Sequence, residues 1–514
     1  MKGMRFVVVA LTAAVLLSTA NQSHAVWVNW DGSESDGAFT NAANWNLDRV
    51  PGDTGNGGDD EDNAVINNGE SVTIDSLVPT NRGVFLGTGA ANSGTLVIEA
   101  GGIIPWTKLE SRIGQAGTGV VQQNGGSWNG SEEEMYLGRD PGSSGTWTMN
   151  GGTLSNCVMY IGNNNSSGRF ELLGATASVE ALSDHVYVGY TNYANGVVYQ
   201  TNGVWNPGAT RNIFLGYDTG ATGTWQMTGG TVSNANQVIV GYKSVGRVEL
   251  GGEGRITASA SHNFVAKEAG SVGTVVQTGG VWDNNGNQIR IGEAAGATGT
   301  WQLSGGALTN VNIFHIGFNG VGTLEISNTG TLAGSTPVIA GSKAGSTGTV
   351  VQTGGVVSNV NQIILGDTDP STGTYRISGG VITNVSQFKC GETGTGTLEI
   401  EGNEAAIHLT GGASFAMAGG DDTLRVILGE TGITPIITDG NITLAGTLEV
   451  DLTNYDFSSS TLTLIDCGGV RSGAFTEPIT VGPEPWSAEV SYIGQDVLLT
   501  NIKGDPRGSL IIIK

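Results

Sequence analysis

Short alternations of apolar and polar residues recur along most of the chain, and each begins with a glycine. Apolar residues stand two and four positions after that glycine, as in the segment Gly145–Met149. A period of two is typical of a β-strand with one buried face. The alternations begin 23 to 28 residues apart, at residues 94, 119, 145, 168, 196, 223, 246, 273, 299, 322, 348, 373 and 396.

Each repeat contains two further apolar segments. One lies about nine residues after the glycine, as at Leu154, and the other ends at the next glycine, as in Tyr160-Ile161-Gly162. Three short strands per repeat predict one coil of a solenoid, in which each coil is covered by its neighbours. We therefore predict an all-β fold, a right-handed parallel β-helix with 13 recognisable coils of about 25 residues. Such a rod is roughly 62 Å long at the usual strand spacing.

The repeats come in triplets, so three types alternate with a period of 74 to 78 residues. The first type has a glutamine four residues after the glycine, the second has an aromatic residue two after it, and the third has a glutamate three after it. The members are Gln123, Gln200, Gln277 and Gln352; Trp147, Trp225, Trp301 and Tyr375; and Glu171, Glu249, Glu325 and Glu399. The tryptophans share the phase of the apolar residues, which favours packing in the core over stacking on sugars.

An asparagine recurs eleven residues after the glycine in five repeats. These residues are Asn156, Asn234, Asn310, Asn359 and Asn384. Asparagine tolerates the left-handed backbone conformation, and its amide can form hydrogen bonds along a stack of coils. We predict that these asparagines form corners of the coil rather than a binding site.

The regular repeat covers residues 94–420. Residues 26–93 lack it, contain the acidic stretch Asp59–Asp62, and are predicted to form an N-terminal capping segment. Residues 421–514 contain further β-rich segments and are predicted to form C-terminal coils and a cap. Caps are expected because the end coils of a solenoid have only one neighbour.

Residues 1–25 have the features of a cleaved signal peptide: Lys2 and Arg5, an apolar run, and the small-x-small sequence Ser23-His24-Ala25. A membrane anchor is the alternative, but the run is shorter than the roughly 20 residues that span a bilayer. We expect a secreted or cell-surface protein with no membrane span after cleavage. A periplasmic location stays open.

The composition narrows the possible partners. Glycine makes up 85 of 514 residues and charged residues only 13%, which disfavours an ordinary helical enzyme. The net charge of −24 makes nucleic acid and anionic lipid poor partners. Three cysteines, Cys157, Cys390 and Cys467, do not make a disulfide framework, and the first two are expected to be buried free thiols.

The segments outside the repeat resemble those of a known class. Trp30-Asp31-Gly32, Asn44-Trp45, Val50-Pro51 and Asn63–Ile66 resemble the opening of exported, glycine-rich β-solenoid surface proteins related to autotransporter passenger domains. Gly446–Leu452 resembles their terminal coils. The resemblance implies an extracellular scaffold and carries over no catalytic residue. The sequence shows no membrane barrel before its last residue, so we do not expect it to anchor itself in an outer membrane.

Pectin-lyase-like β-helices make a polysaccharide lyase or glycoside hydrolase the alternative function. Of the polygalacturonase-like motifs only Asp-Asp occurs, at residues 59–60 and 421–422. A lyase-like site needs acidic Ca²⁺ ligands beside a basic residue, for which Asp367 and Asp369, near Arg376, are the candidates. Calcium is the one cofactor considered, and no metal site is assigned. The histidines fall in different coils and are not expected to cluster.

Two rows of side chains are candidate binding residues. Trp128, Trp205 and Trp282, on the second strand, would make an aromatic ladder for glycan rings if they face outward. The third-type glutamates lie three coils apart, about 14 Å, which is too far for the carboxylate pair of a glycosidase. They are predicted to be a solvated row, or else a repeated ligand or cation contact. The threonines before the strands usually occur singly rather than in a Thr-x-Thr array, which disfavours an ice-binding face.

Taken together, these patterns favour a non-enzymatic, exported surface or matrix scaffold with an adhesin-like role. The expected partners are extracellular polysaccharide or other surface proteins. Rods with imperfect caps are also expected to associate head to tail through their end strands.

Overall fold

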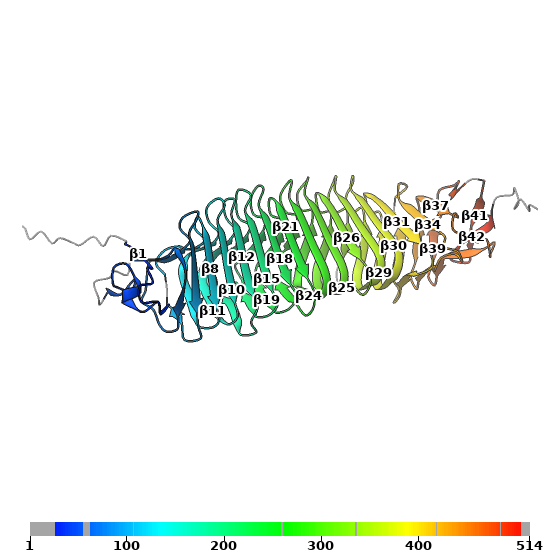
Figure 1. Cartoon of the computed structure of the whole chain (residues 1–514). Coiled ribbons are helices and arrows are strands. Elements are labelled where there is room, and N and C mark those ends of the chain that lie inside the picture. The colour runs from blue at the N-terminus through cyan, green and yellow to red at the C-terminus, as the bar shows by residue number, and fades with distance from the viewer. Residues whose placement is uncertain are drawn as a thin grey trace, which may run out of the picture.

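The computed structural model describes residues 26–54, 62–105, 107–258, 261–334, 337–417, 419–483 and 485–504. The predicted signal peptide and residues 59–61 of the acidic stretch lie outside these ranges. The described chain is an elongated parallel β-solenoid of about 16 turns (Figure 1). The predicted fold class is therefore confirmed, with a few more turns than the 13 recognised from the repeat.

The first face of the solenoid is formed by the strands that begin at the repeat glycine. Its separate strands are β3 (Asn68–Ile74), β5 (Ser93–Ile98), β8 (Thr118–Gln123), β10 (Ser144–Met149), β12 (Ser167–Leu172), β15 (Asn195–Gln200), β18 (Thr222–Met227), β21 (Val245–Leu250), β26 (Val321–Ile326), β31 (Thr395–Glu401), β34 (Thr423–Ile427), β37 (Thr447–Asp451) and β40 (Thr480–Gly482). Neighbours in this series pair in parallel, with the long strands β24 (Val272–Ile291), β25 (Thr298–Ile316), β29 (Thr347–Leu365) and β30 (Thr372–Cys390) completing it.

The second and third faces follow in each turn. The second contains β6 (Ile103–Ile104), β13 (Ala177–Glu180), β16 (Val204–Asn206), β19 (Thr231–Ala235), β22 (Arg255–Ala258), β27 (Thr331–Ala333), β32 (Ala405–Leu409), β35 (Ile436–Thr438) and β38 (Leu462–Cys467). The third contains β1 (Trp27–Asn29), β2 (Asn63–Ile66), β4 (Gly83–Leu86), β7 (Ser111–Ile113), β14 (Val186–Val188), β17 (Asn212–Leu215), β20 (Gln237–Val240), β23 (Asn263–Val265), β28 (Val338–Ala340), β33 (Ser414–Met417), β36 (Ile442–Leu444) and β39 (Arg471–Gly473). β9 (Ser127–Leu137) and β11 (Gly152–Ile161) run through both faces, and the four long strands run through all three.

The repeat glycine is required by a close approach of backbones. A Cβ atom on Gly145 would lie 2.0 Å from the carbonyl oxygen of Ile113 and 2.3 Å from the amide nitrogen of Gly138. Gly138 itself has a φ of 68°, a conformation that favours glycine. In register, Gly145 pairs with the repeat glycines Gly119 and Gly168 of its neighbours. The glycine pattern therefore marks the point where each turn passes closest to the others.

The recurrent asparagines form left-handed corners, as predicted. Their φ angles are 51° to 56°, and the corner lies just after the second strand. The side-chain amide of Asn156 donates to Asn129 at 3.3 Å, and that of Asn310 donates to Asp283 at 3.0 Å. Each bond links neighbouring turns, so these residues tie the stack together along its axis.

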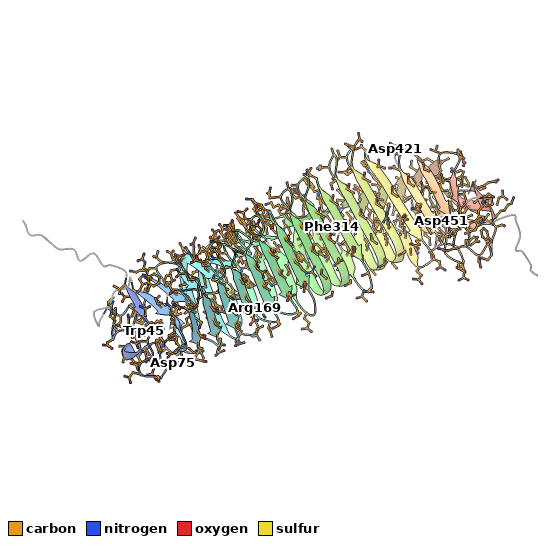
Figure 2. The ribbon with its side chains drawn as sticks, turned by 45° about the horizontal axis from the view of Figure 1, so that its top comes forward. Trp45, Asp75, Arg169, Phe314, Asp421 and Asp451 are labelled. Atoms are coloured by element: carbon orange, nitrogen blue, oxygen red, sulfur yellow. The ribbon has the colours of Figure 1, made fainter. Side chains whose placement is uncertain are left out.

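The parallel ladder begins before the recognised repeat. β1 pairs with β2, and β2 pairs with β4, so strands of the predicted N-terminal capping segment belong to the solenoid ladder. The short 3₁₀ helix η1 (Ala42–Asn44) leads into Trp45, whose ring lies 5.1 Å from that of Trp30. Figure 2 shows Trp45 near one end of the rod and Asp451 near the other.

The C-terminal end closes with an antiparallel pair. β41 (Ser487–Ile493) pairs with β42 (Asp496–Lys503), and β42 pairs antiparallel with β38 of the second face. This reversal covers one edge strand of the last turns, which limits further strand addition there. Within the described ranges, no helix is long and apolar enough to cross a membrane.

Candidate binding faces

The second-strand tryptophans, whose facing the sequence left open, face the core, so they do not form an outward aromatic ladder for glycan rings. Trp128, Trp205 and Trp282 are at most 1% exposed. Trp205 packs against Trp225 with ring centroids 4.8 Å apart, and the other two contact Trp147 and Trp301 in the same way. The glycine before the second strand has a left-handed backbone, as at Gly126 with φ 65°, and resets the alternation of inward and outward residues. The core position predicted for the second-type tryptophans is confirmed.

The first-type glutamines also lie in the core. Gln123, Gln200, Gln277 and Gln352 are fully buried. Their amides donate to backbone carbonyls of the next turn, as in the 3.0 Å bond from Gln277 to Ala307. Their position four residues after the glycine is the inward phase of the first strand, so their role is to pair polar backbone groups inside the stack.

The third-type glutamates form an outward row on the first face. Each contacts a side chain of the preceding turn, which is of the second type, at the position three residues after its repeat glycine. Gln226 donates to Glu249 at 2.9 Å, and Gln302 donates to Glu325 at the same distance. Thr148 donates to Glu171 at 2.8 Å, and the Arg376 guanidinium lies 3.7 Å from Glu399. A glutamate and a polar partner at the same two positions therefore recur four times along one face, once in every three turns.

Arginines neutralise several of these carboxylates. Arg247 Nε lies 2.6 Å from Glu249, and Arg169 Nε lies 2.6 Å from Glu171, in each case two residues earlier on the same strand. Arg425 lies 3.4 Å from Glu399. The carboxylates of these three sites therefore each have a cationic neighbour, whereas Glu325 accepts a hydrogen bond from the neutral Gln302.

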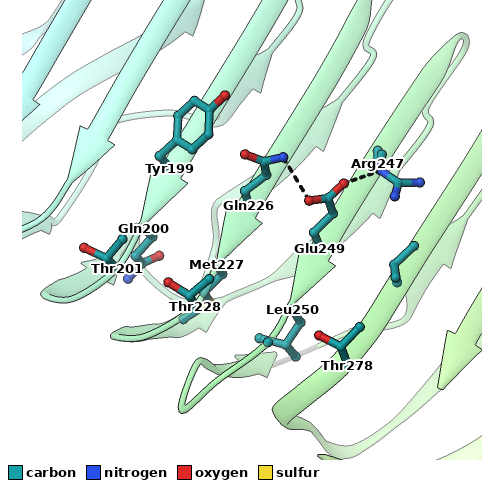
Figure 3. Close-up of a pocket in the computed structure, with 12 residues that line it drawn as sticks. Tyr199, Gln200, Thr201, Gln226, Met227, Thr228, Arg247, Glu249, Leu250 and Thr278 are labelled. Atoms are coloured by element: carbon teal, nitrogen blue, oxygen red, sulfur yellow. Dashed lines mark hydrogen bonds and ion pairs between the residues drawn. The ribbon is translucent and has the colours of Figure 1, made fainter. Parts of the chain in front are cut away.

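A hollow of about 410 Å³ opens on this face across β15, β18, β21 and β24. Its lining includes Tyr199, Gln226, Arg247 and Glu249 together with three threonines, Thr201, Thr228 and Thr278. Figure 3 shows Gln226, Glu249 and Arg247 linked in one hydrogen-bonded row, with Tyr199 on the adjacent strand. Aromatic, amide, carboxylate and guanidinium groups thus converge on one depression.

The structure separates the proposed calcium ligands from their basic partner. Arg376 pairs with Glu399 on the first face, whereas the charges acting on Asp367 are those of Lys343, Glu392 and Lys389. Burial raises the pKa of Asp367. In the part of the chain that is described, no three His, Cys, Asp or Glu residues lie close enough to hold a metal ion. A calcium site at Asp367 and Asp369 stays a prediction.

Other candidate groups have structural roles. Asp422, of the second Asp-Asp motif, is buried and accepts hydrogen bonds from the backbone of Gly396 and Gly419 at 2.9 and 2.7 Å. Cys157, Cys390 and Cys467 are buried free cysteines, and burial raises the pKa of the first two thiols.

An aromatic strip on the outside of the third face was missed. Tyr160 stacks on Tyr136 and Tyr187, with centroids 4.8 and 5.0 Å away and ring planes within 12°. Phe214 continues the stack, and a second row, Tyr190, Tyr217 and Tyr242, packs beside it. In the sequence, each first-row aromatic residue is followed by a buried aliphatic residue and a glycine. Because neighbouring residues of a strand point to opposite sides, this position could have identified the aromatic residues as outward-facing. The first-row rings are at most 8% exposed because they cover one another, so the strip serves mainly to pack the exterior.

Comparison with known proteins adds no family to this picture. No protein-family model matches the chain, and no curated protein is significantly similar to it. The likeness to autotransporter-related surface proteins therefore stands as a resemblance in a few segments. The fold itself is shown by the structure: the chain is a parallel β-solenoid.

Proposed function

We propose that this protein is an exported, non-enzymatic scaffold that adheres to an extracellular polymer through the outside of its first face. The supporting observation is the fourfold recurrence of the polar pair, from Thr148 with Glu171 to Arg376 with Glu399. The pairs are held on a continuous parallel ladder, so their spacing along the axis is regular. A row of polar contacts at a regular spacing suits a partner that is itself repetitive.

Extracellular polysaccharide is the partner that this row fits best. Several weak contacts made at once raise the overall affinity without any single deep site. The net charge of −24 disfavours binding of a polyanion, whereas neutral polysaccharides carry no such penalty. Other surface proteins, and end-to-end association of rods, are weaker proposals because no described contact supports a particular partner.

A β-helical polysaccharide lyase or hydrolase is the second candidate function. It would use Ca²⁺ at Asp367 and Asp369, where burial already raises the pKa of Asp367. A bound cation would stabilise the ionised form of this half-buried carboxylate. This candidate predicts product release, which the scaffold does not.

The deciding experiment combines binding and turnover. Residues 26–514 are mixed with insoluble cellulose, chitin, xylan and mannan, with and without Ca²⁺, and both co-sedimentation and new reducing ends or unsaturated sugars are measured. The scaffold predicts co-sedimentation without products, and binding that weakens stepwise as Glu171, Glu249, Glu325 and Glu399 are changed cumulatively to alanine. Products that disappear in Asp367→Ala would instead establish the enzyme.

Export is tested on the same protein. Expression of residues 1–514 in a bacterial host should yield a processed protein whose first residue is Val26, determined by N-terminal sequencing. Retention of residues 1–25 on a membrane-bound product would contradict the cleaved signal peptide.

A further inference from the structure

Tyr199 is the feature that sets the hollow on the first face apart from the equivalent positions. In register, the corresponding outward residue of the first-type strands is Gln122, Tyr199, Val276 or Val351. Gln226 and Glu249 recur as Gln302 and Glu325 in the next triplet, whereas Thr323 stands there in the place of Arg247. The triplet with the tyrosine is the one in which the 410 Å³ hollow is found.

One face of the Tyr199 ring is already occupied by a cation. The Arg169 guanidinium carbon lies 3.9 Å from the ring centroid, a close cation–π contact. Arg169 is on β12, which pairs with one edge of β15, while β18 and the hollow lie at the other edge. The arginine is itself fixed by Glu171. Arg169 therefore fixes the orientation of the Tyr199 ring from the β12 side. The opposite face of the ring is left to contact a ligand.

The polar groups of the hollow are arranged for a ligand with many hydroxyl groups. The Glu249 carboxylate accepts from Gln226 and from Arg247, and each of its oxygens keeps further lone-pair capacity. The Arg247 guanidinium has donors beyond the one used, and Thr201, Thr228 and Thr278 can both donate and accept. The charges of Arg247 and Glu249 cancel, so the hollow favours a neutral ligand over an ion.

We infer that this hollow is a binding site for a neutral pyranose unit of a glycan, with the sugar ring against Tyr199 and its hydroxyl groups bonded to Gln226, Arg247 and Glu249. The volume is in the range of pockets that enclose small molecules, roughly 300–1,000 Å³. An apolar ring face beside a few oriented polar groups is the usual construction of such a site. The inference rests on the proposed function and names the sugar class recognised by one segment of the adhesive face.

The test is calorimetric titration of residues 26–514 with soluble cellohexaose, xylohexaose, mannohexaose, chitohexaose and hexagalacturonate. We expect binding of at least one neutral hexasaccharide and preference for it over the acidic one. Tyr199→Ala should weaken that binding about tenfold, which corresponds to the loss of about 1.4 kcal/mol, since an aromatic contact is removed. Tyr199→Phe should retain it, because the ring rather than the hydroxyl makes the contact.

A matched control variant sharpens the result. Val351→Ala changes the equivalent position two triplets along, outside the hollow, and should leave affinity unchanged. Unfolding midpoints of all variants are measured first, to show that the ladder is intact.

Several results would overturn the inference: no neutral hexasaccharide binds, hexagalacturonate binds better, or Tyr199→Ala binds like the wild type. The proposed function is judged separately by co-sedimentation with insoluble polysaccharide. If Tyr199→Ala still co-sediments and binds hexasaccharide normally, the hollow is not the sugar site but the adhesive face stands. If neither assay detects binding by the wild type, both proposals fail.

Discussion

The Tyr375 hydroxyl donates a 2.6 Å hydrogen bond to Oε1 of Gln352 inside the core. Tyr375 stands one turn after Gln352, where the other three triplets have Trp147, Trp225 or Trp301. An indole nitrogen and a phenol hydroxyl lie at different places, and Oε1 of Gln123, Gln200 and Gln277 has no hydrogen-bond partner in the described part of the chain. The single tyrosine of this row thus completes the pairing of its glutamine.

Tyr375→Phe should lower the free energy of unfolding by about 1–3 kcal/mol, because it leaves the buried Oε1 of Gln352 unsatisfied. The shift is measured as the change in the urea midpoint at constant slope. The double variant Tyr375→Phe, Gln352→Leu should recover part of the loss, since both polar partners are then gone. Equal midpoints for wild type and Tyr375→Phe would contradict the role of this bond.

Trp225 tests the packing of the core tryptophans. The side chain is 3% exposed and contacts Trp205, so Trp225→Ala should cost about 3–5 kcal/mol, the usual effect of removing a large buried aromatic group. Tyr193 is 73% exposed, and Tyr193→Ala should change stability by no more than about 0.5 kcal/mol. An unchanged denaturation midpoint for Trp225→Ala would show that the inward assignment is wrong.

The coil could be predicted from the sequence because its determinants are local. The repeat glycine follows from the backbone contact at Gly145, and the asparagine corner from the left-handed conformation at Asn156. The first turns were missed because β2 and β4 are buried along their whole length, so they show no alternation to detect. In β4, Phe85 faces outward yet is covered by Trp27, 4.9 Å away.

The site was harder to predict because it depends on relations between turns. The row of glutamates was recognised, but their partners Thr148, Gln226 and Arg376 share a position rather than a chemical type. The facing of Trp128 was left open, since a left-handed glycine between two strands changes which residues point inward. A period-two pattern shows which residues of one strand point inward. It does not show which residues of the next strand do so, because the turn between the strands can shift the alternation.

The repeat glycines should be intolerant of side chains. A Cβ atom on Gly223 would lie 2.1 Å from the carbonyl oxygen of Val188, which is backbone and has no room to move. Gly223→Ala should therefore fail to give a folded rod, or lower the urea midpoint strongly. Gly420→Ala is the control, because a Cβ there meets no atom within 4 Å. Equal midpoints for the two variants would show that the close approach at the repeat glycine is not required.

His315 should make stability depend on pH below neutrality. Its ring is 7% exposed and its Nδ1 lies 2.8 Å from the Ser342 hydroxyl. Burial, helped by the positive charges of Arg290 and Lys343, lowers the pKa of His315 from 6.5 to about 3.

The sign of this dependence follows from proton uptake on unfolding. Between pH 6.5 and about 3 the unfolded chain binds a proton at His315 that the native chain does not, so this contribution to stability is complete above pH 6.5 and is lost as the pH falls. His315→Gln removes the titrating group, and the urea midpoint of this variant should decline less than that of the wild type between pH 7 and pH 4. Contributions from other titrating groups are common to both proteins and cancel in the difference. A difference that stays constant across this range would mean that His315 is as readily protonated in the rod as in the unfolded chain, and that the third face admits water at this turn.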